Sequence, residues 1–274
     1  MKIIAVANQK GGVAKTTSTY NLAIAKAISG SKVLMIDLDP QASLTIACGI
    51  EPGEDRLDGF STVDLFNKKK DPIDTAFEVK TVGLPERVYI IPSDPNLDNT
   101  VNYIGSLDEK IYFIKDACEK FADYDFDYIF IDCPPNLGVL VTNALVAADE
   151  VIIPVKTDYL SYRGVELIMG SVEKVRSNKR MNPSLKVRGI IPTMFRGVTN
   201  DHKEILSILK KQGEILGIVK ESVAASKGDI DGVPAVISDP KSDVAKSYFE
   251  IANKLWYTNV YHSNIHLYII LRRL

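Results

Sequence analysis

A glycine- and lysine-rich segment near the start of the chain, residues 8–17 (NQKGGVAKTT), constrains the fold more than any other feature. It follows an apolar run at residues 3–7 and precedes residues 18–28, where apolar side chains recur at helical spacing until Gly30. A glycine-rich loop between a strand and a helix turns backbone N–H groups toward phosphate oxygens, and the helix dipole adds positive potential there. The segment therefore predicts a phosphate-binding loop in an α/β domain.

The side chains of this loop are those that bind a nucleoside triphosphate and Mg²⁺. Lys15 is placed to reach the β- and γ-phosphates, and the Thr16 hydroxyl is a typical Mg²⁺ ligand. The common pattern G-x-x-x-x-G-K-[ST] is not met, because Gln9 and Ala14 occupy its two glycine positions. The methyl group of Ala14 must therefore fit where the backbone and a phosphate approach closely. The nucleotide-binding residues expected in the loop are Lys10, Gly11, Gly12, Val13, Ala14, Lys15, Thr16 and Thr17.

Short apolar runs, with helical stretches between them, predict the strands of one sheet. They cover residues 3–7, 33–36, 88–91, 128–131, 151–155 and 187–191. Most are continuous rather than alternating runs, which is typical of strands buried on both faces. The predicted fold is α/β, with a mostly parallel twisted sheet covered by helices on both faces, of the P-loop NTPase type. We expect one domain over residues 1–255, a surface excursion of short helices at 51–85, and a C-terminal tail at 256–274.

Two further segments place carboxylates at the ends of predicted strands. In KVLMIDLDPQ, Asp37 and Asp39 follow an apolar run, and strand alternation puts both on the side that faces the phosphate loop. In YIFIDCPPNLG, Asp132 follows a mostly apolar strand, which is the Walker B arrangement for presenting a carboxylate to Mg²⁺. A turn capped by aspartate is the alternative for the first segment. We expect Thr16, Asp37 and Asp132 to form the Mg²⁺ site, in which Asp37 supports either the ligand shell of the ion or the lysine of the loop.

The loop, the D-x-D-P-Q segment and DCPPNLG together resemble the ParA/Soj partition ATPases, a branch of the ParA/MinD superfamily with the deviant loop K-G-G-x-x-K-T-T. The pattern can be followed from Met1 to about Leu255. The resemblance implies weak intrinsic hydrolysis of ATP to ADP, with ATP and Mg²⁺ as cofactors. It also implies a catalytic set in which Lys15 binds phosphate, Asp39 orients the attacking water, and Lys10 reaches the nucleotide of a partner subunit.

The resemblance extends to later segments of the chain. Residues 190–194 (IIPTM) look like the segment that packs near the nucleotide base, so Pro192 and Met194 are expected nucleotide contacts. Residues 222–226 and 245–255 resemble the last strand and the closing helix. The implied function is a molecular switch that partitions plasmid or chromosomal DNA. In it, an ATP-bound sandwich homodimer binds DNA without sequence preference, and hydrolysis stimulated by a centromere-binding, ParB-like partner releases the DNA.

The charge of the chain limits how DNA is bound. With 33 basic and 35 acidic residues the formal net charge is -2, so a DNA contact requires a local basic face. Two arginines that short chromosomal members of the family use for DNA fall at Val198 and Ala224 in this sequence. A basic stretch at residues 174–188 and an arginine close to the first position are expected to substitute for them, unless the stretch is only a solvated helix end. The candidate DNA contacts are Arg196, Lys179 and Arg180.

Composition bears on location and on the alternative functions. Three cysteines whose spacing fits no zinc or disulfide framework, and no secretory signal, predict a cytoplasmic protein. The resemblance to the partition ATPases implies that it associates with the nucleoid. The alternative is a MinD-like ATPase that positions proteins at a membrane or cell pole, with the tail, which ends HLYIILRRL, as an amphipathic anchor. We do not expect a membrane contact, because the DLDPQ segment differs from that branch. A third alternative is a metal-cluster enzyme like the nitrogenase iron protein. It would need paired cysteines at a dimer axis, and the three cysteines here offer no obvious pair.

Overall fold

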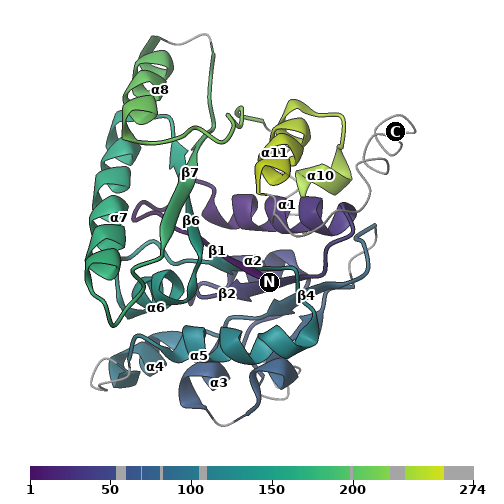
Figure 1. The fold of residues 1–274 in the computed structure, drawn as a ribbon. Helices are drawn as coiled ribbons and strands as arrows, with labels where there is room; N and C mark the ends of the chain where they lie inside the picture. The colour runs from purple at the N-terminus through teal and green to yellow at the C-terminus, as the bar shows by residue number, and fades with distance from the viewer. Residues whose placement is uncertain are drawn as a thin grey trace.

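The strands that the structure describes form one sheet, in the order β3-β4-β2-β5-β1-β6-β7 (Figure 1). The computed structural model describes residues 1–53, 60–68, 70–80, 83–104, 110–197, 200–222 and 232–255. The strand bounds are β1 Lys2–Val6, β2 Val33–Asp37, β3 Phe77–Glu78, β4 Val88–Ile91, β5 Tyr128–Asp132, β6 Glu150–Lys156 and β7 Lys186–Thr193. Neighbouring strands pair in parallel, except that β3 is antiparallel to β4. The predicted α/β fold with a mostly parallel sheet is confirmed.

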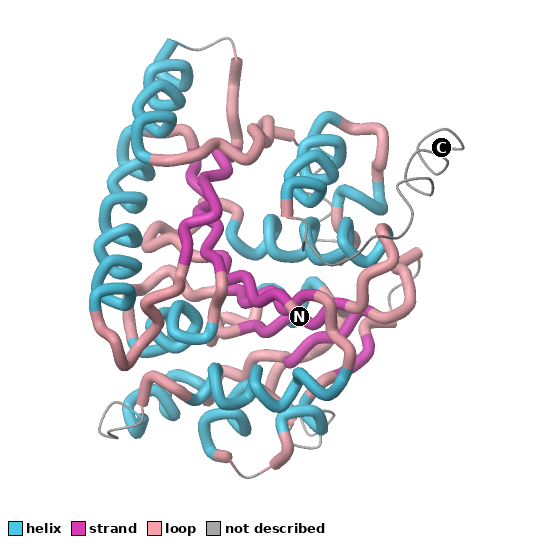
Figure 2. The backbone as a smooth tube through the Cα atoms, in the orientation of Figure 1, coloured by secondary structure: helices cyan, strands magenta, loops and turns pink. Residues whose placement is uncertain are grey.

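Helices cover both faces of the sheet (Figures 1 and 2). One face carries α1 (Lys15–Ile28), α10 (Ala235–Ser238) and α11 (Asp243–Lys254). The other face carries α5 (Phe113–Lys120), α6 (Val139–Ala147) and α7 (Tyr159–Ser177). The remaining helices of the described residues are α2 (Ser43–Ala47), α3 (Thr62–Asn67), α4 (Leu97–Ile104) and α8 (Asn200–Gln212), with 3₁₀ helices η2 (Pro72–Thr75) and η3 (Phe121–Tyr124). Among these helices, we find none long and apolar enough to cross a bilayer.

Strand alternation explains why the two helical layers share one sheet. On β2, Leu34 and Ile36 belong to the core beneath α5–α7, whereas Val33 and Met35 belong to the core beneath α1. All four side chains are fully buried. Because both faces are covered, the strands read as continuous apolar runs, which is the pattern that predicted them.

The segment predicted as a surface excursion, 51–85, contains α3, η2 and β3 in its described part. It is anchored as well as exposed, because Leu65 and Phe66 of α3 are buried in the core beneath α5–α7. A capping box starts α3: Val63 N–H donates to the Ser61 hydroxyl, and Asp64 accepts from Ser61 N–H. The two-residue strand β3 was missed, because a pairing of two residues leaves too short a pattern to recognise.

Helix α1 begins at Lys15, three residues earlier than the apolar periodicity predicts. It ends as Gly30 predicts: with φ 94°, Gly30 donates to Ala27 O and Ser31 donates to Lys26 O, which closes the last turn. On its outer side α1 contacts α11, where the Ser18 and Tyr248 hydroxyls lie 3.1 Å apart.

The end of the chain is described only in part. Helix α11 lies where the closing helix was expected. Residues 223–226 of the expected last strand, and the tail at 256–274, lie outside the described residues.

Candidate nucleotide site

The phosphate loop connects β1 to α1 at the carboxyl edge of the sheet. Two of its residues have left-handed backbone conformations, Gly12 at φ 68° and Ala14 at φ 64°. Glycine adopts this conformation freely, whereas it costs alanine about 1–2 kcal/mol. The loop therefore favours glycine at position 14, and the structure keeps the left-handed conformation with alanine at this cost.

Strands β6 and β7, which follow β1 in the sheet, both hold the loop. Asn8, which is buried, donates to Pro154 O of β6 at 2.7 Å and accepts from Lys10 N–H at 3.0 Å. Thr193 at the end of β7 donates to Val13 O at 3.1 Å. Helix α7 also approaches closely, because a Cβ atom at Gly164 would lie 2.4 Å from Asn8 Oδ1 and 3.5 Å from Lys10 Cβ. Sequence reasoning assigned no role to Asn8 or Gly164, since their partners are far away along the chain.

Lys15 lies inside the loop rather than in solvent. Only 7% of the residue is exposed, and its ammonium group donates to Lys10 O at 3.2 Å. Burial lowers the pKa of Lys15, and the nearby Asp132 carboxylate opposes this shift. A buried ammonium group in a loop of backbone donors is suited to a ligand with concentrated negative charge, such as a triphosphate. Lys10, in contrast, is exposed.

Asp132 at the end of β5 is joined to the first turns of α1. Thr16 Oγ1 donates to Asp132 Oδ2 at 2.7 Å, and Thr19 Oγ1 lies 3.2 Å from Oδ1. Asp132 is fully buried and stands in register with Asp37 of β2. Burial, with the charge of Asp37, raises the pKa of Asp132 to about 8. Thr19 was missed, although its spacing of three residues from Thr16 places both on one helix face.

Asp37 is held mainly by the segment that follows it. Its Oδ2 accepts from Thr45 N–H at 2.9 Å and from Thr45 Oγ1 at 2.7 Å, and its Oδ1 accepts from Asp39 N–H at 3.1 Å. Burial raises the pKa of Asp37 to about 6, while the Thr45 hydrogen bonds oppose this shift. Asp39 Oδ1 caps a turn by accepting from Gln41 N–H at 3.0 Å, so the aspartate-capped turn is present as well as the predicted carboxylate pair.

The oxygen atoms gathered here fit a divalent cation. Two buried carboxylates in register and a threonine hydroxyl are hard ligands of the class that Mg²⁺ prefers. Among the described residues no cluster of three or more His, Cys, Asp or Glu side chains could hold a metal alone. Cys133, beside Asp132, is buried and burial raises the pKa of its thiol, so it is a packing residue.

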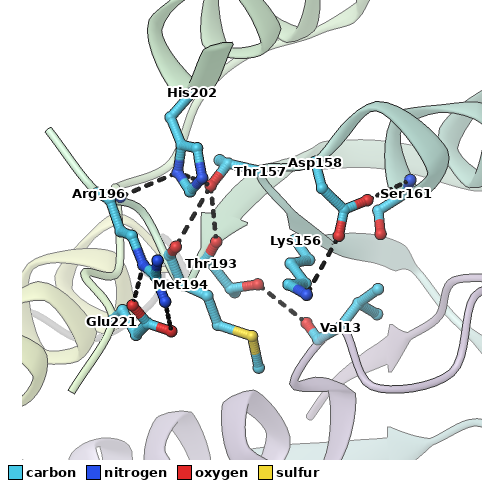
Figure 3. A network of polar contacts seen from close by, with 10 residues as sticks. All are labelled: Val13, Lys156, Thr157, Asp158, Ser161, Thr193, Met194, Arg196, His202 and Glu221. Carbon is cyan, nitrogen blue, oxygen red and sulfur yellow. Dashed lines mark hydrogen bonds and ion pairs between the residues drawn. The ribbon is translucent and has the colours of Figure 1, made fainter. Parts of the chain in front are cut away.

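The expected base-contacting residues lie at the end of β7. Pro192 is buried, and Met194 follows the strand with a left-handed φ of 51° (Figure 3). Beyond them, His202 ties the next loop to β6: its Nδ1 lies 2.7 Å from Thr157 Oγ1 and accepts from Arg196 N–H at 3.0 Å. The segment expected near the base is therefore held at the carboxyl end of β6. The same strand accepts a hydrogen bond from Asn8 of the phosphate loop.

The candidate DNA contacts differ in their availability. Arg196 is engaged in an ion pair with Glu221, in which Nη2 donates to Oε1 at 2.9 Å (Figure 3). Lys179 and Arg180 are exposed in the turn after α7. Arg188, also in the basic stretch, forms ion pairs with Glu150 and Glu214 and donates a hydrogen bond to Lys254 O. The two family positions, Val198 and Ala224, lie outside the described residues.

Comparisons with known proteins agree on the kind of protein. Residues 1–187 match the AAA_31 family, an AAA domain. The chain is 30% identical over 259 residues to chromosome partitioning protein ParA of Caulobacter vibrioides, covering 93% of this chain and 94% of that protein. It is 33% identical over 258 residues to sporulation initiation inhibitor protein Soj of Bacillus subtilis, covering 93% and 98%. The structure of cobyrinic acid a,c-diamide synthase from Mycobacterium smegmatis, with bound ADP and magnesium, is similar at TM-score 0.77 and 30% identity, covering 92% and 93%.

A phosphate loop at the start of α1, with carboxylates at the ends of β2 and β5, defines a P-loop protein built on a mostly parallel sheet. Within that class, the chain belongs to the ParA/Soj family of partition ATPases, in the ParA/MinD superfamily.

Proposed function

We propose that the protein is a Mg²⁺-dependent ATPase whose ATP-bound homodimer binds DNA and moves a plasmid or a chromosomal region. The observation that carries the proposal is the link between loop and sheet: Thr16 of the phosphate loop donates to Asp132, beside the buried Lys15. That arrangement gathers a phosphate-binding cation and metal-binding oxygens at one place. The bound ADP and magnesium of the similar synthase structure support this choice of ligands.

Each residue of the site has a proposed task. Lys15 and the backbone donors from Lys10 to Thr17 bind the β- and γ-phosphates. Thr16 and Asp132 hold Mg²⁺, with Asp37 supporting them, and the ion supplies charge stabilisation on the phosphate oxygens. Asp39 orients the water that attacks the γ-phosphate. Pro192 and Met194 contact the base.

Lys10 is proposed to act on the nucleotide of a second copy of the chain. Its side chain is exposed, whereas Lys15 fills the loop from inside. The loop around Lys10 also lies against α7 at Gly164, so a second copy that covers the loop would contact this helix as well. Both features support a nucleotide-sandwich dimer, because a lysine directed outward cannot repeat the task of Lys15.

DNA binding is proposed through the exposed basic turn at Lys179 and Arg180, with Arg196 as a further contact. The dimer doubles the number of phosphate contacts on one surface, so DNA binding becomes ATP-dependent and steeply salt-dependent. A centromere-binding, ParB-like partner is proposed to stimulate hydrolysis, in a cytoplasmic, nucleoid-associated cycle. The MinD-like alternative depends on residues 256–274, which lie outside the described residues.

Sequence relatives favour partition over amide synthesis. The relatives named ParA and Soj share 30% and 33% identity with this chain and are covered almost completely, 94% and 98% of their lengths. The synthase structure is similar in fold, at TM-score 0.77 and 30% identity. Its activity is named for that protein alone, and the described part of this chain offers nothing that singles it out.

The proposal is tested first by nucleotide binding and turnover. Lys15→Ala should abolish binding of a slowly hydrolysed ATP analogue in calorimetry, because it removes the charge at the β- and γ-phosphates. Asp39→Ala should bind ATP with nearly unchanged affinity and stop turnover, because a water-orienting carboxylate acts in the transition state. Unchanged affinity in the first variant would refute the loop assignment, and wild-type turnover in the second would refute the role of Asp39.

A further inference from the structure

Thr45 directs both of its donors at one oxygen of Asp37. Its N–H donates to Asp37 Oδ2 at 2.9 Å and its hydroxyl donates to the same atom at 2.7 Å. Both side chains are fully buried. Thr45 lies in α2, eight residues after Asp37, so it contacts the carboxylate from beyond the turn that contains Asp39.

The orientation of the Thr45 hydroxyl is set from a second strand. Ser93 N–H, two residues past the end of β4, donates to Thr45 Oγ1 at 2.8 Å. A hydroxyl has one proton, and here its oxygen already accepts from a backbone donor. The proton is therefore directed at Asp37, which accepts it as a carboxylate.

The other oxygen of Asp37 holds Asp39. Asp37 Oδ1 accepts from Asp39 N–H at 3.1 Å, and Asp39 Oδ1 in turn accepts from Gln41 N–H at 3.0 Å. The contacts form one chain from Ser93 through Thr45 and Asp37 to Asp39. Both oxygens of the buried Asp37 carboxylate therefore help to fix the turn at residues 38–42. Oδ2 accepts from Thr45, which follows the turn, and Oδ1 accepts from Asp39 within it.

We propose that Thr45 is a positioning residue for hydrolysis: through Asp37 it fixes the backbone from which Asp39 orients the attacking water. This inference rests on the proposed function, because the role of Asp39 is itself proposed. Thr45 makes no contact with nucleotide in this account. Its loss should therefore lower turnover while leaving ground-state binding of ATP in place.

The test compares Thr45→Val, which keeps the shape and removes the hydroxyl, with Thr45→Ser, which keeps the hydroxyl. We expect Thr45→Val to lower kcat about 10- to 100-fold, the effect of losing a hydrogen bond to a charged group, with analogue affinity within about 3-fold of wild type. Thr45→Ser should restore kcat to within about 3-fold of wild type. Thr62→Val is the matched control, because Thr62 is also fully buried and its hydroxyl has no hydrogen-bond partner among the described residues.

Each outcome decides the question. Wild-type kcat in Thr45→Val, while Asp39→Ala is inactive, overturns the positioning role and leaves the proposed function intact. Wild-type kcat in Asp39→Ala instead removes the catalytic assignment on which the inference rests. Equal losses in Thr45→Val and Thr62→Val would reduce Thr45 to a packing residue. If Thr45→Val does not fold, Thr45→Ala removes the hydroxyl with a smaller side chain, and wild-type kcat in that variant overturns the role.

Discussion

The hydroxyl of Thr16 donates a 2.7 Å hydrogen bond to Oδ2 of Asp132, although the two residues are 116 positions apart in the sequence. The contact joins the first turn of α1 to the end of β5. It places a hydroxyl and a buried carboxylate, the two types of group that P-loop proteins use for Mg²⁺, beside Lys15.

Lys10→Ala should bind nucleotide as wild type does but fail to form an ATP-dependent dimer. Lys10 is exposed, and Lys15 alone fills the loop, so removing Lys10 leaves the contacts within one subunit in place. Light scattering with and without ATP measures the change, and Lys15→Ala is the control that loses binding itself. A normal ATP-dependent dimer in Lys10→Ala would place the action of Lys10 within its own subunit.

Ala14→Gly should change the stability of the nucleotide-free protein very little, in the stabilising direction. Glycine relieves a left-handed strain of about 1–2 kcal/mol and costs about 0.5–1 kcal/mol of chain entropy, so a gain between zero and about 1.5 kcal/mol is expected. Denaturant unfolding measures it. Ala25→Gly, inside α1, is the control and should be destabilising by at least about 0.5–1 kcal/mol. A loss in Ala14→Gly equal to that control would contradict the strain at Ala14.

Lys26→Met should stabilise the protein near neutral pH. Lys26 is 4% exposed, and burial lowers its pKa to about 8, below the ordinary value of 10.5. Between pH 8 and 10.5 the unfolded chain therefore holds more protons than the folded one, so wild-type stability rises with pH in this range. Below pH 8 the full penalty is present, and we expect Lys26→Met to be more stable by about 1–3 kcal/mol.

Urea unfolding at pH 7 and at pH 10 checks this expectation, with Lys120→Met, at an exposed position, as the control. The advantage of Lys26→Met should shrink as the pH rises. If the free energies of unfolding of Lys26→Met and Lys120→Met differed by the same amount at pH 7 and at pH 10, burial of the Lys26 charge would not limit stability.

Glu221→Gln should strengthen DNA binding by the ATP-bound protein. Glu221 pairs with the Arg196 guanidinium, so the substitution frees a candidate phosphate contact and removes a negative charge beside it. Filter binding at fixed salt should show a several-fold gain that does not depend on DNA sequence. Glu214→Gln is the matched control, because Glu214 pairs with the internally used Arg188. Equal gains in both variants would assign the effect to net charge and not to Arg196.

Local patterns in the sequence were sufficient for every described strand of the sheet except β3, and for placing the candidate site residues at its carboxyl edge. The phosphate loop, Asp37, Asp39 and Asp132 were predicted because each follows an apolar run, and strand ends in a parallel sheet meet at one edge. The start of α1 was predicted at residue 18, three residues after its actual start at Lys15. The reason is that α1 begins with polar residues, whose burial depends on the sheet beneath them.

The contacts that support the site were not predictable in the same way. Thr45 and Ser93 meet only because α2 and the end of β4 lie together, and no local pattern encodes a contact 48 residues apart. The pairing of Arg196 with Glu221 across 25 residues is another example. The sequence around Gly164 indicates only an ordinary helical glycine. In the structure, a Cβ atom at this position would lie 2.4 Å from Asn8 Oδ1 of the loop. Such roles depend on how distant elements pack.

Binding of DNA in different nucleotide states tests the central claim most directly. The purified protein is titrated with two unrelated duplexes in the presence of ATP, of ADP and of no nucleotide, over a range of salt. Asp39→Ala with ATP serves as the trapped state, and a double charge reversal at Lys179 and Arg180 as the contact control. We predict equal binding of both duplexes with ATP only, a steep loss with salt, and weakened binding in the charge-reversal variant with its DNA-free ATP turnover unchanged. An ATP-bound dimer that ignores DNA at low salt would contradict the partition function.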